Sequence, residues 1–237
     1  MALVHKRRNA NAALRVRMMI GEVLCVLVPL ALTAWFCMDW RKQKTPSLPL
    51  ACAALICAAA GALLSRWLHT RAAILSSGLA GERRAQELLR SLPRGYQVLT
   101  NACFTVHDSR MELDAIVIGR SGAFIVEVKN HTGTIQGRPE AAAWTQKTHF
   151  AKKKMNNPLH QLEREQRLTR QLLHTLHIAC PVYGGVFFAN EDVYVQVRDP
   201  RIYWDPSALA RAIRSLPALS DPVDPAAVCA ALQHAAL

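Results

Sequence analysis

The sequence predicts a mixed α/β domain preceded by an N-terminal pair of transmembrane helices. Two observations lead to this fold class. Two long apolar runs stand near the N-terminus, and after residue 77 helical periodicity alternates with strand-like apolar runs. A chain of 237 residues has room for one domain of ordinary size and an appendage.

The first apolar run extends from Met18 to Met38 and contains one charged residue, Glu22; the second begins at Leu48 and is free of charge until Arg66. Each run approaches the roughly 20 residues that cross about 30 Å of hydrocarbon. A soluble helical hairpin and a cleaved signal peptide are the alternatives, but a signal has a shorter apolar region and leaves the second run unexplained. We therefore expect a membrane anchor over residues 1–77, with spans at about 18–38 and 48–68.

The charge distribution predicts the orientation of these spans. Of the formal net charge of +12, residues 1–77 carry +8 (ten Lys/Arg and two Asp/Glu) and the remainder +4 (nineteen and fifteen). The basic residues flank both outer ends of the spans, which places both ends in the cytoplasm and the loop at 39–46 outside. We expect a multi-pass protein of the cytoplasmic (inner) membrane, in contact with the lipid bilayer and with its C-terminal domain in the cytoplasm. A soluble part at +4 permits binding to a polyanion without requiring it.

The elements after residue 77 follow one another in a simple order. Leucine spacing predicts a helix at 79–92, which ends at Pro93 and Gly95. The expected strands and helices that follow are a strand at 96–106, a hairpin at 112–130, a helix from Asn157-Pro158, strands at 182–190, 193–197 and 202–204, and helices opening at Asp205-Pro206 and Asp224-Pro225. Residues 132–155 remain unassigned. We expect one domain at 78–200 and a helical extension at 201–237.

The hairpin at 112–130 carries carboxylates in otherwise apolar strands. Whether its turn is Arg120-Ser121 or the four residues 119–122, paired residue numbers sum to 241, so Asp114 lies opposite Glu127 and Lys129 shares their face. Two opposed carboxylates repel each other and need a cation between them, and Mg²⁺ commonly binds one or two carboxylates while keeping several waters. The alternative is a structural cluster in which Lys129 pairs with both acids.

Four ordered motifs resemble the nuclease-related domain (NERD) family, which is similar to the PD-(D/E)XK nucleases. The motifs are Gly81-Glu82, Leu113-Asp114, the run from Gly122 to Asn130, and Asn157-Pro158-Leu159 with Gln161. The resemblance covers roughly residues 78–190. Leu113 stands where the family commonly has isoleucine, and the proline of the wider superfamily's name is absent. The resemblance implies a restriction-endonuclease-like mixed sheet flanked by helices.

The resemblance also implies roles for individual residues. Asp114 and Glu127 would bind Mg²⁺ or Mn²⁺, Lys129 would assist the attacking water, Glu82 would be an auxiliary carboxylate, and Gln161 would organise the site or hold substrate. The implied activity is hydrolysis of phosphodiester bonds in DNA, or in RNA, by a membrane-anchored enzyme that faces the cytosol. The alternatives are an inactive, membrane-tethered module that binds nucleic acid or protein, and a protein whose spans carry the function.

A basic run precedes the helix of Gln161. Lys147, Lys152, Lys153 and Lys154 are interleaved with Trp144 and Phe150, a composition suited to binding phosphates and stacking a base. A solvated run without a partner has the same composition. We expect these lysines to contact nucleic acid, DNA in preference to RNA.

Overall fold

The computed structural model describes residues 1–6, 10–43 and 48–237. The chain divides into two compact units, Asn9–Leu79 and Met1–Arg8 together with Ala80–Leu237. The second of these units includes residues 201–237 together with the strands and helices that precede them.

The first unit is a pair of helices, α1 (Ala10–Gln43) and most of α2 (Leu48–Arg90). Both helices are long and apolar enough to cross a bilayer, and their apolar windows are not buried by the rest of the chain. Residues 69–78, between the second expected span and the expected helix at 79–92, are helical as well, since α2 runs without a break to Arg90. Arg7, Arg8 and residues 44–47, which enter the orientation argument, lie outside the described residues.

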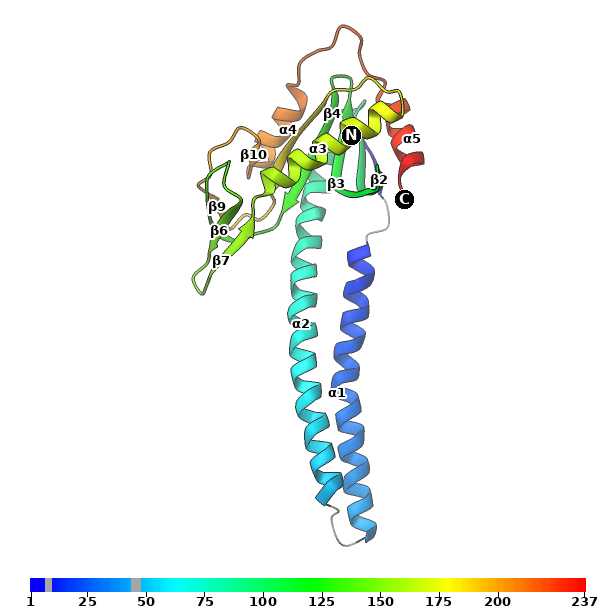
Figure 1. The fold of residues 1–237 in the computed structure, drawn as a ribbon, viewed down its shortest axis with the longest axis vertical. Coiled ribbons are helices and arrows are strands. Elements are labelled where there is room, and N and C mark those ends of the chain that lie inside the picture. The colour runs from blue at the N-terminus through cyan, green and yellow to red at the C-terminus, as the bar shows by residue number, and fades with distance from the viewer. Residues whose placement is uncertain (7–9, 44–47) are drawn as a thin grey trace. The chain divides into compact units, whose positions relative to one another are not determined.

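The two helices approach each other closely within this unit. A Cβ atom added at Gly61 would lie 2.7 Å from the carbonyl oxygen of Cys25, so only glycine allows this contact. Nearer the other end, Nδ1 of His69 lies 3.0 Å from Oε1 of Glu22. The two helices therefore form an antiparallel hairpin (Figure 1).

The second unit is built on a six-stranded mixed sheet with the order β1-β2-β3-β4-β8-β10. The strands are β1 (Leu3–Lys6), β2 (Gln97–Val106), β3 (Ser109–Gly119), β4 (Gly122–Lys129), β8 (Val182–Phe188) and β10 (Ile202–Tyr203). Strands β2, β3 and β4 are antiparallel to one another, whereas β1 pairs in parallel with β2, β8 with β4, and β10 with β8. The mixed sheet with flanking helices confirms the predicted fold class.

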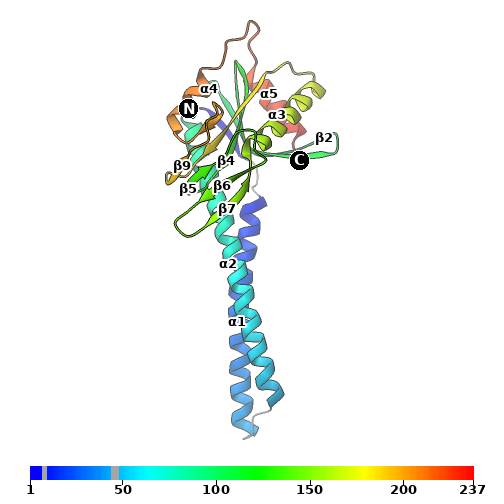
Figure 2. The same cartoon turned by 60° about the vertical axis from the view of Figure 1, so that its left-hand side comes forward.

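A second sheet of four short strands, with the order β7-β6-β5-β9, accounts for the segment that the sequence left unassigned. Its strands are β5 (Gly133–Gln136), β6 (Ala143–Lys147), β7 (Lys152–Asn156) and β9 (Val193–Val195). In Figure 2 these strands form a lobe beside the main sheet. Trp144 fills the inner side of the lobe, with 1% of its surface exposed and its Nε1 donating to the carbonyl oxygen of Arg138 at 2.9 Å.

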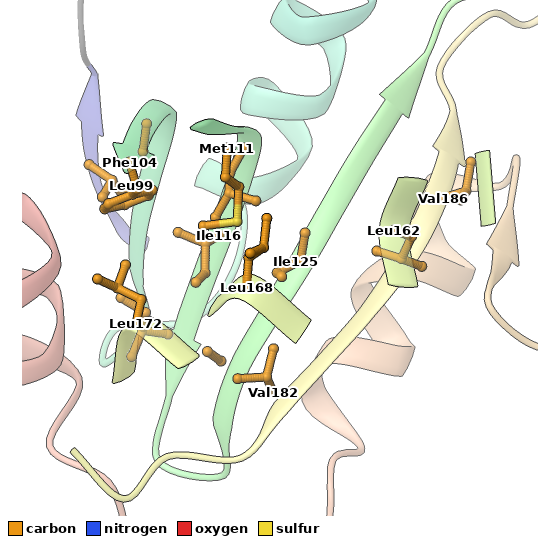
Figure 3. Close-up of a cluster of buried hydrophobic side chains, with 14 of the residues drawn as sticks. Leu99, Phe104, Met111, Ile116, Ile125, Leu162, Leu168, Leu172, Val182 and Val186 are labelled. Atoms are coloured by element: carbon orange, nitrogen blue, oxygen red, sulfur yellow. The ribbon is translucent and has the colours of Figure 1, made fainter. Parts of the chain in front are cut away.

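Helices cover both faces of the main sheet, which explains its nearly continuous apolar strands. Helices α3 (Pro158–Thr175) and α5 (Pro225–Ala235) share one buried cluster with the sheet, and the end of α2 shares the other with α4 (Pro206–Arg214). Figure 3 shows the first cluster, in which Leu162, Leu168 and Leu172 of α3 lie near Ile116 and Ile125 of the sheet. This packing holds α3 across the face on which the hairpin carboxylates were expected.

Candidate metal-dependent nuclease site

The β3–β4 hairpin has the predicted register. Its pairs run from Gly119↔Gly122 to Ala115↔Val126, so the paired numbers sum to 241 and the turn is Arg120-Ser121. The ladder ends one step before Asp114 and Glu127. There Oδ2 of Asp114 accepts a 2.8 Å hydrogen bond from the backbone N–H of Val128, so a side chain replaces the strand partner.

An irregularity in β2 lies directly across from Asp114. The pairs Thr100↔Ala115 and Ala102↔Leu113 flank it, and Asn101 between them has a φ of 54°, in the left-handed region that asparagine tolerates. Regular alternation would put Leu113 and Ile116 on opposite faces, yet both belong to the same buried cluster. The alternation of side chains along β3 therefore reverses at Asp114, where a side-chain hydrogen bond replaces the pairing between strands.

Glu127 is almost completely buried at the end of β4, with 1% of the residue exposed. Its Oε1 accepts a hydrogen bond from the ammonium group of Lys129, which also donates to Oε1 of Gln161 at 3.0 Å. The side chain of Lys129 is 22% exposed and that of Glu127 is 2% exposed. The lysine thus joins the buried carboxylate to the surface of the domain.

Gln161 reaches this point because the start of α3 is firmly held. Asn157 caps the helix as predicted, accepting from the N–H of Leu159 at 2.9 Å. The Nδ2 atom of the same residue donates to the carbonyl oxygens of Pro139 and Ala141, both at 2.7 Å. These bonds tie the first turn of α3 to the loop before β6, and Gln161 projects from that turn towards Lys129.

Glu165 is a site residue that the sequence analysis missed. It is 3% exposed, and its Oε1 accepts a 2.9 Å hydrogen bond from Nε2 of Gln161. It lies midway between the buried residues Leu162 and Leu168, so a carboxylate interrupts the apolar stripe of α3. That interruption of the apolar stripe was the feature of the sequence from which Glu165 could have been predicted as a site residue. Glu127, Lys129, Gln161 and Glu165 form one connected chain of polar contacts.

The site holds more negative charge than its single lysine compensates. Burial, and next the charge of Glu127, raise the pKa of Asp114 to about 8, although the Val128 N–H and Lys129 oppose the shift. Burial, followed by Glu127, raises the pKa of Glu165 to about 9. Among the described residues, Oε2 of Glu127 and Oε2 of Glu165 are buried without a hydrogen-bond partner. The site is therefore short of donors or of a cation.

Glu82 approaches the site from α2. A Cβ atom at Gly81 would lie 2.7 Å from Cβ of Asn130, so the missing side chain lets the helix lie directly against the end of β4. The charge of Glu82 is among the causes that raise the pKa of Asp114, though the smallest of them. The five residues expected in the catalytic site, Glu82, Asp114, Glu127, Lys129 and Gln161, thus come together around the ends of β3 and β4.

The coordinates also bear on metal binding. Over the part of the chain that the structure describes, no group of three or more His, Cys, Asp or Glu side chains forms a preformed metal cage. The ammonium group of Lys129 contacts Glu127, while Asp114 accepts a backbone hydrogen bond. Two carboxylates with spare oxygens suit an ion that keeps most of its waters, whereas a closed structural site would need more protein ligands.

The expected nucleic-acid-binding residues lie on the β6–β7 hairpin. The pairs Lys147↔Lys152 and Thr145↔Lys154 place three lysines on one face, while Lys153 pairs with Gln146 on the other. Phe150, in the turn, is 99% exposed. The expectation that Trp144 could stack on a base is wrong, because its ring is buried beneath this sheet as part of the core.

Comparison with known proteins agrees with this description. Residues 77–189 match the family model described as the nuclease-related domain, NERD, which confirms the resemblance seen in the motifs. An uncharacterised protein from Bacillus anthracis is 41% identical over 86 residues, which are 35% of this chain and 41% of that protein, so the match spans less than half of the relative. No solved structure matches the chain. Over residues 77–189, just under half of its length, the chain therefore matches the nuclease-related domain, NERD.

Proposed function

We propose that this protein is a metal-dependent nuclease that hydrolyses phosphodiester bonds, DNA in preference to RNA, while anchored in the cytoplasmic membrane. The observation that carries the proposal is the convergence of Asp114, Glu127, Lys129 and Gln161, which come from two strands and a helix. The match to a nuclease-related domain supports the same reaction class.

Asp114 and Glu127 are the residues that would hold Mg²⁺ or Mn²⁺. The buried Oε2 of Glu127 lacks a donor among the described residues, and the raised pKa of Asp114 indicates that a positive charge there would be favourable. Carboxylate oxygens are the ligands that these hard ions prefer. A bound ion would polarise the scissile phosphate and lower the pKa of a coordinated water.

The chain's own residues would orient the reactants. Lys129 is the partly exposed cation of the site, so its ammonium group can donate to a phosphate oxygen or to the attacking water. Gln161 holds that ammonium group from the other side, and Glu165 holds Gln161. The carboxylate of Glu82 adds negative charge beside Asp114 and so favours cation binding.

The position of β1 supports a hairpin topology for the membrane anchor. Residues Leu3–Lys6 pair in parallel with Gln97–Thr100, so the segment before α1 and the domain after α2 belong to one folded unit. If both helices cross the bilayer, the chain must return to the side from which it started. The excess of basic residues at both outer ends favours the cytoplasm as that side.

The test is a cleavage assay on full-length protein in detergent, with labelled single-stranded and duplex DNA and RNA, in Mg²⁺, Mn²⁺ or chelator. We expect cleavage with metal, none with chelator, and a loss of at least about 100-fold in Asp114→Asn and Glu127→Gln. Both variants should keep the circular dichroism spectrum of the parent. Full metal-dependent cleavage by both variants would refute the assignment, and retardation of the nucleic acid without cleavage would favour the binding module.

A further inference from the structure

The outer face of the second sheet carries two rows of polar side chains. Thr134 of β5 pairs with Tyr194 of β9 on one side and with Lys147 of β6 on the other, and Lys147 pairs with Lys152 of β7. Directly paired residues point to the same side of a sheet. Tyr194, Thr134, Lys147 and Lys152 therefore form one row across all four strands.

The second row lies two residues further along and faces the same way. It consists of Gln196, Gln136, Thr145 and Lys154. The side chains of Gln136 and Gln196 meet across the strands, with Nε2 of the first donating to Oε1 of the second at 2.7 Å. This hydrogen bond places both glutamines on one side of the sheet, as the register requires.

The opposite face of the sheet belongs to the core. Ile135, Trp144 and Val195 are 0%, 1% and 7% exposed and pack in the cluster shared with α3. None of the eight residues in the two rows above belongs to that cluster, so the outer face is open to a partner. Lys153 of the edge strand β7 points to the opposite side from Lys152 and Lys154, so it is next to them in sequence but does not belong to the outer face.

The chemistry of the outer face fits a polyanion with exposed bases. Three of its eight side chains are lysines, none is acidic, and its aromatic ring, Tyr194, is 65% exposed. Lysines bind phosphates, whereas an exposed ring stacks on a base and is indifferent to its identity. In a duplex the bases are already stacked on one another, so a ring on an open sheet face can stack only on an unpaired base.

Two concave surfaces share residues with this face and carry further exposed aromatic rings. One cavity of about 700 Å³ is lined by Thr134, Lys147 and the 99% exposed Phe150, with Asp192 as its acidic residue. The other, of about 850 Å³, is lined by Tyr194, Arg198 and the 52% exposed Trp204. Asp199 in its lining is neutralised by Arg201 at 2.8 Å.

We propose that the outer face of the second sheet binds single-stranded nucleic acid, with Lys147, Lys152 and Lys154 on its phosphates and Tyr194 stacked on a base. Strand β7 leads through the Asn157 cap into the first turn of α3, which carries Gln161. The same segment of the chain thus connects the bound strand with the candidate site. That the bound strand is a substrate rests on the proposed nuclease function, but the binding of a single strand can be measured without any cleavage. Tyr194 lies beyond residues 77–189, so the family match does not include it.

The test measures binding of full-length protein in detergent to a labelled oligothymidylate and to a duplex of equal length, in chelator to prevent cleavage. We expect the single strand to bind more tightly. Tyr194→Ala should weaken its binding by roughly 5- to 100-fold, the usual range for loss of one stacked base, while Tyr194→Phe keeps the ring and the affinity. The triple change of Lys147, Lys152 and Lys154 to Gln should lower the slope of log affinity against log salt by about 2.

Lys152→Gln and Lys153→Gln form a matched pair, because they remove the same charge from adjacent positions on opposite faces. We expect the first to reduce the affinity clearly more than the second. Equal effects of the pair, or tighter binding of the duplex with no effect of Tyr194→Ala, would overturn the proposal. If the variants of the outer face keep both the affinity for the single strand and the cleavage activity, this inference is refuted and the nuclease function is not. If binding depends on the outer face but the protein cleaves no nucleic acid, the nuclease function is refuted and this inference is not.

Discussion

The ammonium group of Lys129 donates a 3.0 Å hydrogen bond to Oε1 of Gln161, which joins the end of β4 to the first turn of α3. The amide of Gln161 continues the contact to the buried Glu165. The direction of the lysine is therefore set by a second element of the fold, and this arrangement leads to the first of four predictions.

Gln161→Ala should lower cleavage activity by roughly 10- to 100-fold, the usual cost of removing a group that orients a catalytic residue. The loss should appear mainly in kcat, because Lys129 loses its orientation while the carboxylates stay in place. Gln171→Ala, an exposed position on the same helix, is the control and should retain activity. Equal activity of the two variants would show that Gln161 is an ordinary surface residue.

The raised pKa values of Asp114 and Glu165 predict that the metal-free protein loses stability as pH rises. Between the ordinary carboxyl value near 4 and their folded values of about 8 and about 9, the folded chain binds more protons than the unfolded chain. The free energy of unfolding therefore falls across this window and is greatest below it. Thermal unfolding in chelator from about pH 5 to pH 9 measures the decline, at about 2–4 °C for each kcal/mol.

Glu165→Gln should flatten that decline, because a neutral amide replaces a carboxyl that must otherwise ionise in a buried site. Glu140→Gln, at an exposed position, should leave it unchanged. Mg²⁺ should raise Tm more at the alkaline end, where protons no longer compete for the carboxylates. A Tm that climbs steadily with pH in chelator would mean that both carboxyls are ionised in the folded protein.

Gly81→Ala should destabilise the domain by about 1–3 kcal/mol, since the new Cβ would lie 2.7 Å from Cβ of Asn130 and push the end of β4 aside. The same displacement should weaken metal binding, because Glu127 and Lys129 are on that strand. Gly78→Ala, three residues earlier on the same helix, meets nothing within 4 Å and should stabilise the helix by up to about 1 kcal/mol. Chemical denaturation compares the two variants, and similar stability would rule out the close contact.

The pairing of β1 with β2 predicts that both chain ends lie on one side of the membrane. Short epitope tags before Met1 and after Leu237 should both resist protease in spheroplasts, and both should be cleaved in inverted vesicles. Cleavage of one tag in each preparation would exclude the hairpin topology.

Much of the candidate site could be predicted because its determinants are local. The two-residue turn after Gly119 fixes the hairpin register. The Asn-Pro and Asp-Pro pairs before α3, α4 and α5 predict the N-caps at Asn157, Asp205 and Asp224. The convergence of Gln161 with Lys129 was implied by the family resemblance, not by any local pattern.

The remaining features depend on contacts between segments far apart in the sequence. The charge of Glu127 helps to raise the pKa of Glu165, and the two residues come together only when α3 packs on the sheet. The second sheet consists of strands of three to five residues with polar outer positions, too short for their alternation to be recognised. Trp144 sits within a basic run, and only the fold shows that its ring belongs to the core. The left-handed backbone conformation of Asn101 could not be predicted from the sequence pattern.

The parallel strand β1, which precedes both long helices, also bears on biosynthesis. Its partner in β2 is translated only after both long helices, so β1 stays unpaired until a strand made much later has been synthesised. A nascent chain whose segment before α1 had been exported could not supply that edge of the sheet. If both helices cross a membrane, the six-stranded sheet can therefore be completed only in chains that have been inserted as a hairpin.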